Sequence, residues 1–124
     1  MSKKKILLVI DDEKPIADGI KMMLTSEEID CMAAYDGEEA LSKAKEQQPD
    51  LILLDVRMPG LDGFEVLENL KKNVSTSNIP VIMVTSCDQP EDIEKANRLG
   101  ATDYVLKPVN FDDLTSRVAK QLKI

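Results

Sequence analysis

The chain has 124 residues, which suits one domain, and 43% of them are hydrophobic, which argues against disorder. Its formal net charge is −7, which disfavours direct binding to nucleic acid or to an anionic membrane surface. No apolar run approaches the roughly 20 residues of a membrane span. We therefore expect one domain over residues 1–124, with neither nucleic acid nor membrane among its direct partners.

The cysteine and histidine content narrows the chemistry further. The two cysteines, Cys31 and Cys87, form no C-x-x-C pair, which is typical of a cytoplasmic protein without disulfides. Histidine is absent, which excludes Ser/His/Asp hydrolysis, histidine-ligated metals and an autophosphorylating histidine.

The first half of the chain alternates strands and helices. Strands are predicted at Ile6–Ile10, Cys31–Tyr35 and Leu51–Leu54. Pro15 suits the first turn of a helix with one apolar face, formed by Ile16, Ile20, Met23 and Leu24. Asp36 can cap a second helix, which Pro49 limits and whose apolar residues are Ala40, Leu41 and Ala44.

The second half continues the alternation. A helix opens at Gly63, with the apolar residues Leu67, Leu70 and Val74. After the strand Val81–Val84, Pro90 opens a helix that Gly100 closes, with the apolar residues Ile93, Ala96 and Leu99. The last strand, Tyr104–Leu106, precedes a helix marked by Phe111, Leu114, Val118 and Leu122. Met22, Met23, Met58 and Met83 suggest core or loop packing.

Strand followed by helix, five times over, predicts a single doubly wound α/β sheet. The strands Ile6–Ile10, Leu51–Leu54 and Val81–Val84 are apolar at every position, as expected of parallel strands covered on both faces. Cys31–Tyr35 is less hydrophobic, which favours an edge position. The elements alone do not determine the strand order.

Polar residues stand where four of the five strands end. Asp11 and Asp12 follow the first strand, Asp55 the third, Thr85 the fourth and Lys107 the fifth. In open α/β sheets, ligands bind outside the carboxyl ends of the strands. Three carboxylates there suit Mg²⁺, a cation that prefers oxygen ligands. The cation and Lys107 would offset the repulsion among the acids.

Other kinds of site fit less well. A glycine-rich phosphate loop is absent after the first strand, and the acids there would repel a nucleotide or flavin phosphate. A haloacid-dehalogenase-type phosphatase requires a second aspartate two residues after the first, where this chain has Arg57. A purely structural acidic edge leaves Thr85 and Lys107 unexplained. A phosphoryl-accepting site accounts for all of these residues.

The chain resembles the receiver domain of two-component response regulators, the CheY-like, flavodoxin-like fold. The acidic pair, Asp55 followed by MPGLDG, Thr85, and Lys107-Pro108 occur in the order and spacing of that family. The resemblance implies five helices and a five-stranded parallel sheet in the order 2-1-3-4-5. That order separates Cys31 from Cys87 by about 14 Å, too far for a disulfide. Ser86 and Val109 depart from the family's usual alanine and phenylalanine, and Phe111 could fill the phenylalanine's space.

The resemblance also implies roles for the site residues. Asp55 resembles the phosphoacceptor. Asp12, Asp55 and the backbone carbonyl of Arg57 resemble the Mg²⁺ ligands, with Asp11 holding the ion through water. Lys107 resembles the lysine that pairs with the phosphoryl group. Thr85 and Tyr104 resemble the switch pair, a hydroxyl that moves to the phosphoryl group and a ring that moves behind it.

The implied function is a phosphorylation switch rather than an enzyme with a separate substrate. A histidine kinase or phosphotransfer protein would donate the phosphoryl group. An output partner would bind the face of the fourth helix, fifth strand and fifth helix. Charges of both signs on this face also suit a weak phosphorylation-dependent homodimer. Two alternatives stay open: a receiver excised from a longer regulator or kinase with a missing output module, and a binding module that is never phosphorylated.

Overall fold

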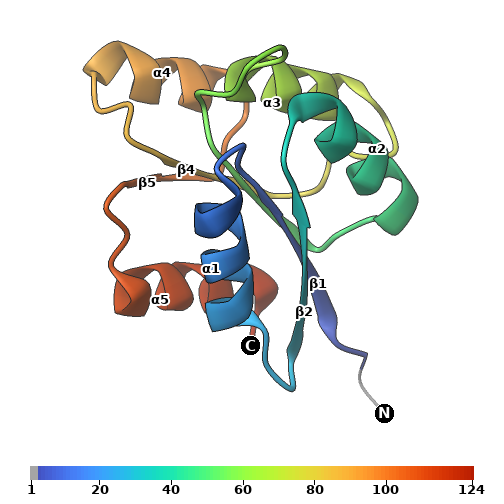
Figure 1. Ribbon diagram of the computed structural model, residues 1–124. Coiled ribbons are helices and arrows are strands. Elements are labelled where there is room, and N and C mark those ends of the chain that lie inside the picture. Colours follow the sequence, from blue (N-terminus) through green and yellow to red (C-terminus); the bar gives the residue numbers. More distant parts are fainter. Residues whose placement is uncertain (1–2) are drawn as a thin grey trace.

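The computed structural model describes residues 3–124 and contains one parallel sheet in the order β2-β1-β3-β4-β5 (Figure 1). The strands are β1 (Lys5–Ile10), β2 (Ile29–Ala34), β3 (Leu51–Leu54), β4 (Val81–Thr85) and β5 (Asp103–Leu106). The helices are α1 (Lys14–Leu24), α2 (Gly37–Gln47), α3 (Gly63–Lys72), α4 (Pro90–Arg98) and α5 (Phe111–Leu122). The predicted doubly wound fold is confirmed.

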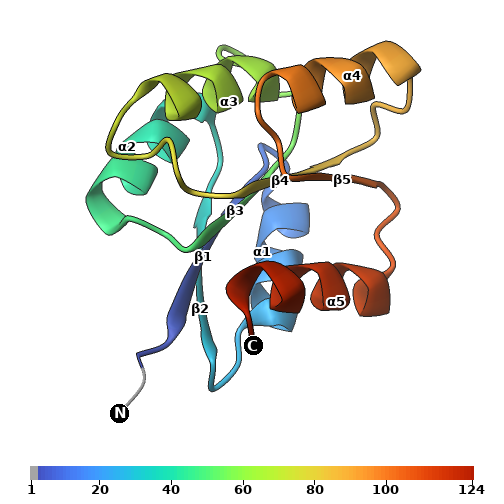
Figure 2. The ribbon, with the colours of Figure 1, turned by 180° about the vertical axis from the view of Figure 1, so that it is seen from behind.

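Helices cover both faces of the sheet. Figures 1 and 2 show α1 and α5 on one face, and α2, α3 and α4 on the other. Two hydrophobic clusters correspond to these layers. Leu8 and Ile10 of β1 face one cluster, whereas Leu7 and Val9 face the other, because successive side chains of a strand point to opposite faces. This is why the central strands are apolar at every position.

Local side-chain caps mark the starts of α2 and α3, and the cap of α2 was expected from the sequence. Asp36 accepts a hydrogen bond from the backbone N–H of Glu39 at 2.8 Å and caps α2. Asp62 and Glu65 form a reciprocal capping box at the start of α3. The capping box before Gly63 fixes the start of α3 after the loop that follows β3.

Four apolar residues are more exposed than we expected. The helix α3 ends at Lys72, and Val74 lies in the following loop with 91% of its surface exposed. That loop is closed by the Thr76 hydroxyl, which donates to the Leu70 carbonyl at 2.7 Å. Met22 and Met23 are also exposed, and the buried residues of α1 are Ala17, Ile20 and Leu24. Met23 was expected on the apolar face of this helix, and Met22 in core or loop packing.

The turn before α5 provides the fourth difference. Phe111 is 38% exposed, whereas Val109 packs against the cluster under α1 and α5. Val109 therefore contributes to this cluster, whereas Phe111 stays partly exposed. Met58 and Met83 are buried as predicted.

The two cysteines are free and lie in different clusters. Cys31 belongs to the edge strand β2, which begins two residues earlier than predicted. Cys87 follows the end of β4 rather than lying on the strand. Because the sheet separates the two thiols, an intramolecular disulfide is excluded. Across residues 3–124, no helix combines the length and the apolar character that crossing a membrane requires.

Candidate phosphorylation site

The site lies at the carboxyl edge of the sheet, where backbone pairing continues past the strand ends. The N–H of Asp11 donates to the Ala34 carbonyl at 3.1 Å, and the N–H of Asp55 donates to the Ile10 carbonyl at 3.0 Å. In the same way, the backbone N–H of Lys107 donates to the Thr85 carbonyl at 2.9 Å. Sheet hydrogen bonds therefore position the residues that sequence analysis singled out.

Three carboxylates converge at this edge. Asp11, Asp12 and Asp55 each offer an oxygen, and these oxygens all lie within 4.8 Å of one another. Asp11 is only 2% exposed and Asp55 only 6%. Three converging hard oxygen donors fit a magnesium ion, which keeps part of its water shell and so needs few protein ligands.

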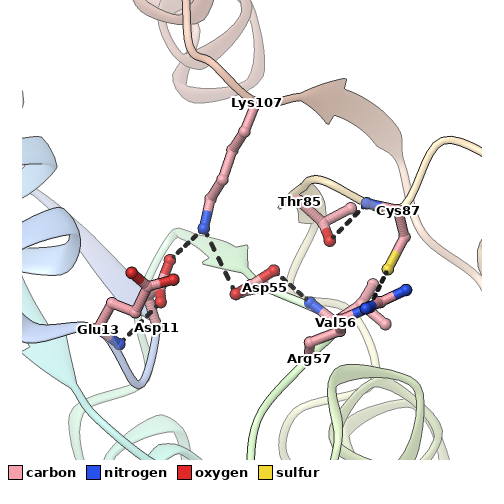
Figure 3. A network of polar contacts seen from close by, with 8 residues as sticks. All are labelled: Asp11, Glu13, Asp55, Val56, Arg57, Thr85, Cys87 and Lys107. Carbon is pink, nitrogen blue, oxygen red and sulfur yellow. Dashed lines mark hydrogen bonds and ion pairs between the residues drawn. The ribbon is translucent and has the colours of Figure 1, made fainter.

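Lys107 neutralises part of this charge (Figure 3). Its Nζ lies 2.7 Å from Asp11 Oδ2 and 3.4 Å from Asp55 Oδ2. Burial lowers the pKa of Lys107, but the hydrogen bond to Asp11 and the charges of Asp55 and Asp11 outweigh it, so the net shift is upward. Lys107 therefore stays an ammonium, and it counters the repulsion among the acids.

This arrangement disfavours the ionised form of the Asp55 carboxyl. Burial, followed by the negative charge of Asp11, raises the pKa of this carboxyl. The Lys107 ammonium and the Val56 N–H, which donates at 2.8 Å, act in the opposite direction but do not cancel the rise. The ionised Asp55 is thus less stable in the fold than in water, and a bound cation would relieve this.

We expect Asp55→Asn to raise the free energy of unfolding by about 1 kcal/mol at neutral pH without divalent cations. A carboxyl whose pKa is raised by folding contributes stability at low pH and loses it as the pH rises through its folded pKa. The asparagine lacks this loss, so the gain should shrink toward acid pH. Urea denaturation in EDTA measures it, with the exposed Asp30→Asn as control. An equal gain at acid pH would contradict the explanation.

The proposed switch residues meet at Cys87. Thr85 is buried, and its Oγ1 accepts a hydrogen bond from the Cys87 N–H at 3.2 Å. The Tyr104 hydroxyl donates to the Cys87 carbonyl at 2.6 Å, and burial raises the pKa of Tyr104 to about 12. Sequence analysis considered Cys87 only as a disulfide candidate. Its place two residues after Thr85 was the one available signal.

Arg57 follows Asp55 by two residues in the loop between β3 and α3. Its side chain is exposed and contacts Cys87, with Nε 3.3 Å from Sγ. The proposed ligand role concerns only its backbone carbonyl.

A parallel sheet in this order, with acids, a hydroxyl and a lysine at its carboxyl edge, defines the class of CheY-like receiver domains. Residues 7–119 match the family model described as the response regulator receiver domain. The chain therefore belongs to the response regulator receiver domain family.

Solved structures agree with this assignment. A CheY-like receiver domain protein from Methanospirillum hungatei JF-1 is 30% identical, with a TM-score of 0.91, and the match covers 98% of this chain and 95% of that one. The receiver domain of the Francisella response regulator 1452 is 37% identical, with a TM-score of 0.88 and coverage of 97% and 98%. The Vibrio cholerae chemotaxis protein CheY4 is 29% identical, with a TM-score of 0.89 and coverage of 95% and 98%.

Proposed function

We propose that residues 1–124 form one receiver domain that accepts a phosphoryl group on Asp55. The donor is a phosphohistidine of a histidine kinase or phosphotransfer protein. An Asp55 carboxylate oxygen attacks phosphorus, the bond from phosphorus to the imidazole nitrogen breaks, and an aspartyl phosphate forms. The observation that carries the proposal is the buried Asp55 carboxylate, which stands beside Asp11, Asp12 and the Lys107 ammonium.

The residues divide the work of stabilising charge. Phosphoryl transfer depends mainly on positioning and on neutralising the phosphoryl oxygens. Lys107 supplies one positive charge. When bound by Asp12, Asp55 and the Arg57 carbonyl, with Asp11 acting through water, Mg²⁺ would supply the rest. No general base is needed, because a carboxylate oxygen attacks without losing a proton.

Mass spectrometry of the intact wild-type protein tests this function. After incubation with acetyl phosphate and Mg²⁺, we expect a mass increase of one phosphoryl group. EDTA should prevent the increase. The same test should be repeated with a phosphorylated phosphotransfer protein as donor. A mass that stays unchanged with every donor, with or without EDTA, would favour the alternative of a binding module without phosphorylation.

Mg²⁺ at about 100 times its Kd should raise the melting temperature by about 10 °C, since it binds only the folded protein. Asp12→Ala should lose most of this shift, because it removes a direct ligand. Asp30→Ala is the matched control, since Asp30 is exposed on β2 away from the carboxyl edge. Differential scanning calorimetry measures all three. Equal shifts in wild type and Asp12→Ala would remove Asp12 from the site.

We further propose that output passes through the face of α4, β5 and α5. Tyr104 lies on β5 and is joined to the loop before α4 by its bond to the Cys87 carbonyl. A shift of Thr85 toward a phosphoryl group would therefore reach this face through Cys87. Leu106, at the end of β5, is 44% exposed and offers an apolar contact for a partner.

The ion pairs of Arg117 affect whether the protein can form a homodimer through this face. It is paired within the chain, to Asp103 at 2.7 Å and to Asp113 at 3.0 Å. A two-fold interface using these charges would have to break existing pairs. We therefore expect a monomer in sedimentation velocity at about 0.1 mM with beryllofluoride and Mg²⁺, where a contact of about −5 to −6 kcal/mol would be visible. A salt-sensitive dimer formed only with beryllofluoride would establish self-association as the output.

A further inference from the structure

Cys87 joins three parts of the site through three different atoms. Its N–H donates to Thr85 Oγ1 at 3.2 Å, and its carbonyl accepts from the Tyr104 hydroxyl at 2.6 Å. Its Sγ accepts from Arg57 Nε at 3.3 Å. The first two contacts belong to the backbone and are retained when the side chain is replaced. Only the third depends on the thiol.

The thiol contact determines where the charge of Arg57 lies. Arg57 is exposed and follows Asp55 by two residues, and Cys87 Sγ is the acceptor that its side chain contacts. Figure 3 shows its guanidinium turned toward Cys87, whereas Lys107 approaches Asp55 from the side of Asp11. Arg57 and Cys87 also border an open pocket, together with Asp92 and Lys95.

Carboxylates attract the same guanidinium. Asp92 lines the same pocket as Arg57, and Asp55 precedes Arg57 by two residues in the loop. Arginine forms strong bidentate pairs with carboxylates. A guanidinium released from Cys87 could pair with the acidic cluster and would then compete with a divalent cation for the same oxygens.

We propose that Cys87 is a positioning residue of the phosphorylation site. Its thiol holds the Arg57 guanidinium outside the cluster of Asp11, Asp12 and Asp55, and so keeps that cluster open to the divalent cation. The inference rests on the proposed function, because it concerns the same cation. In this proposal the side chain of Arg57 must stay outside the acidic cluster, whereas its backbone carbonyl would bind the cation.

Isothermal titration calorimetry with Mg²⁺ tests the proposal on the folded protein. We expect Cys87→Ala to weaken Mg²⁺ binding about fivefold, the scale of the net contribution of one typical hydrogen bond. Cys87→Ser retains an acceptor for the guanidinium and should stay within about twofold of wild type. The double variant Arg57→Ala/Cys87→Ala should return to the affinity of Arg57→Ala, because no guanidinium is left to compete.

The double variant distinguishes a positioning role of Cys87 from a general loss of packing. Packing damage from Cys87→Ala would persist when Arg57 is also removed, whereas competition by the guanidinium would disappear. Equal affinities for wild type and Cys87→Ala would overturn the proposal, as would a double variant as weak as Cys87→Ala. Neither result affects Asp55 as phosphoacceptor. A wild-type protein that fails to bind Mg²⁺ would overturn the metal site itself, together with this inference.

Discussion

Asp55→Asn is expected to abolish phosphorylation by acetyl phosphate or by a phosphorylated histidine donor. An amide oxygen is a far poorer nucleophile than a carboxylate, and it provides no negative charge for the cation. The surroundings should otherwise persist, because the amide can still accept the Val56 N–H and Lys107 retains its bond to Asp11. Intact-mass measurement should show no phosphorylated species.

A second substitution in the same region serves as control. Asp62→Asn lies seven residues further on, at the N-cap of α3, where asparagine is also a good cap. This variant should be phosphorylated like wild type. If Asp55→Asn gains a phosphoryl group at the wild-type rate, Asp55 is not the acceptor, and peptide mapping of the modified protein should then identify the true site.

Gly63→Ala is expected to lower the free energy of unfolding by about 3 kcal/mol. A β-carbon at this position would lie 2.7 Å from Val56 Cα and would also collide with the Asp55 carbonyl. The close approach is needed because the Gly63 N–H donates to the Val56 carbonyl at 2.7 Å. The start of α3 thus packs directly on the backbone of the residue that we propose to be phosphorylated.

Gly19→Ala is the matched control for this effect. Gly19 lies in α1, and a β-carbon there would meet no atom within 4 Å. Alanine is the better helix former, so this variant should gain about 0.5–1 kcal/mol. Urea denaturation of the three proteins in EDTA makes the comparison. A Gly63→Ala variant as stable as wild type would mean that the loop after β3 can move away from α3.

The amino-acid sequence by itself determined most of the architecture. The uninterrupted apolar strands predicted parallel strands covered on both faces, and Asp36 began its helix as predicted. The candidate site residues Asp11, Asp55, Thr85 and Lys107 were also evident, because a parallel sheet brings the carboxyl ends of its strands to one edge. These conclusions depend only on local periodicity and on the direction of the strands.

Tertiary structure alone decided the pairing within that edge. Lys107 bonds to Asp11, 96 residues away, at a shorter distance than to Asp55, 52 residues away. The upward pKa shift of Asp55 depends on the burial and the neighbouring charge that this packing creates. Apolar periodicity also misjudged Met23 and Val74, because burial requires a neighbouring surface as well as an apolar side chain. The contact between Arg57 and Cys87 joins two loops whose paths follow from the packed helices, so no sequence pattern predicts it.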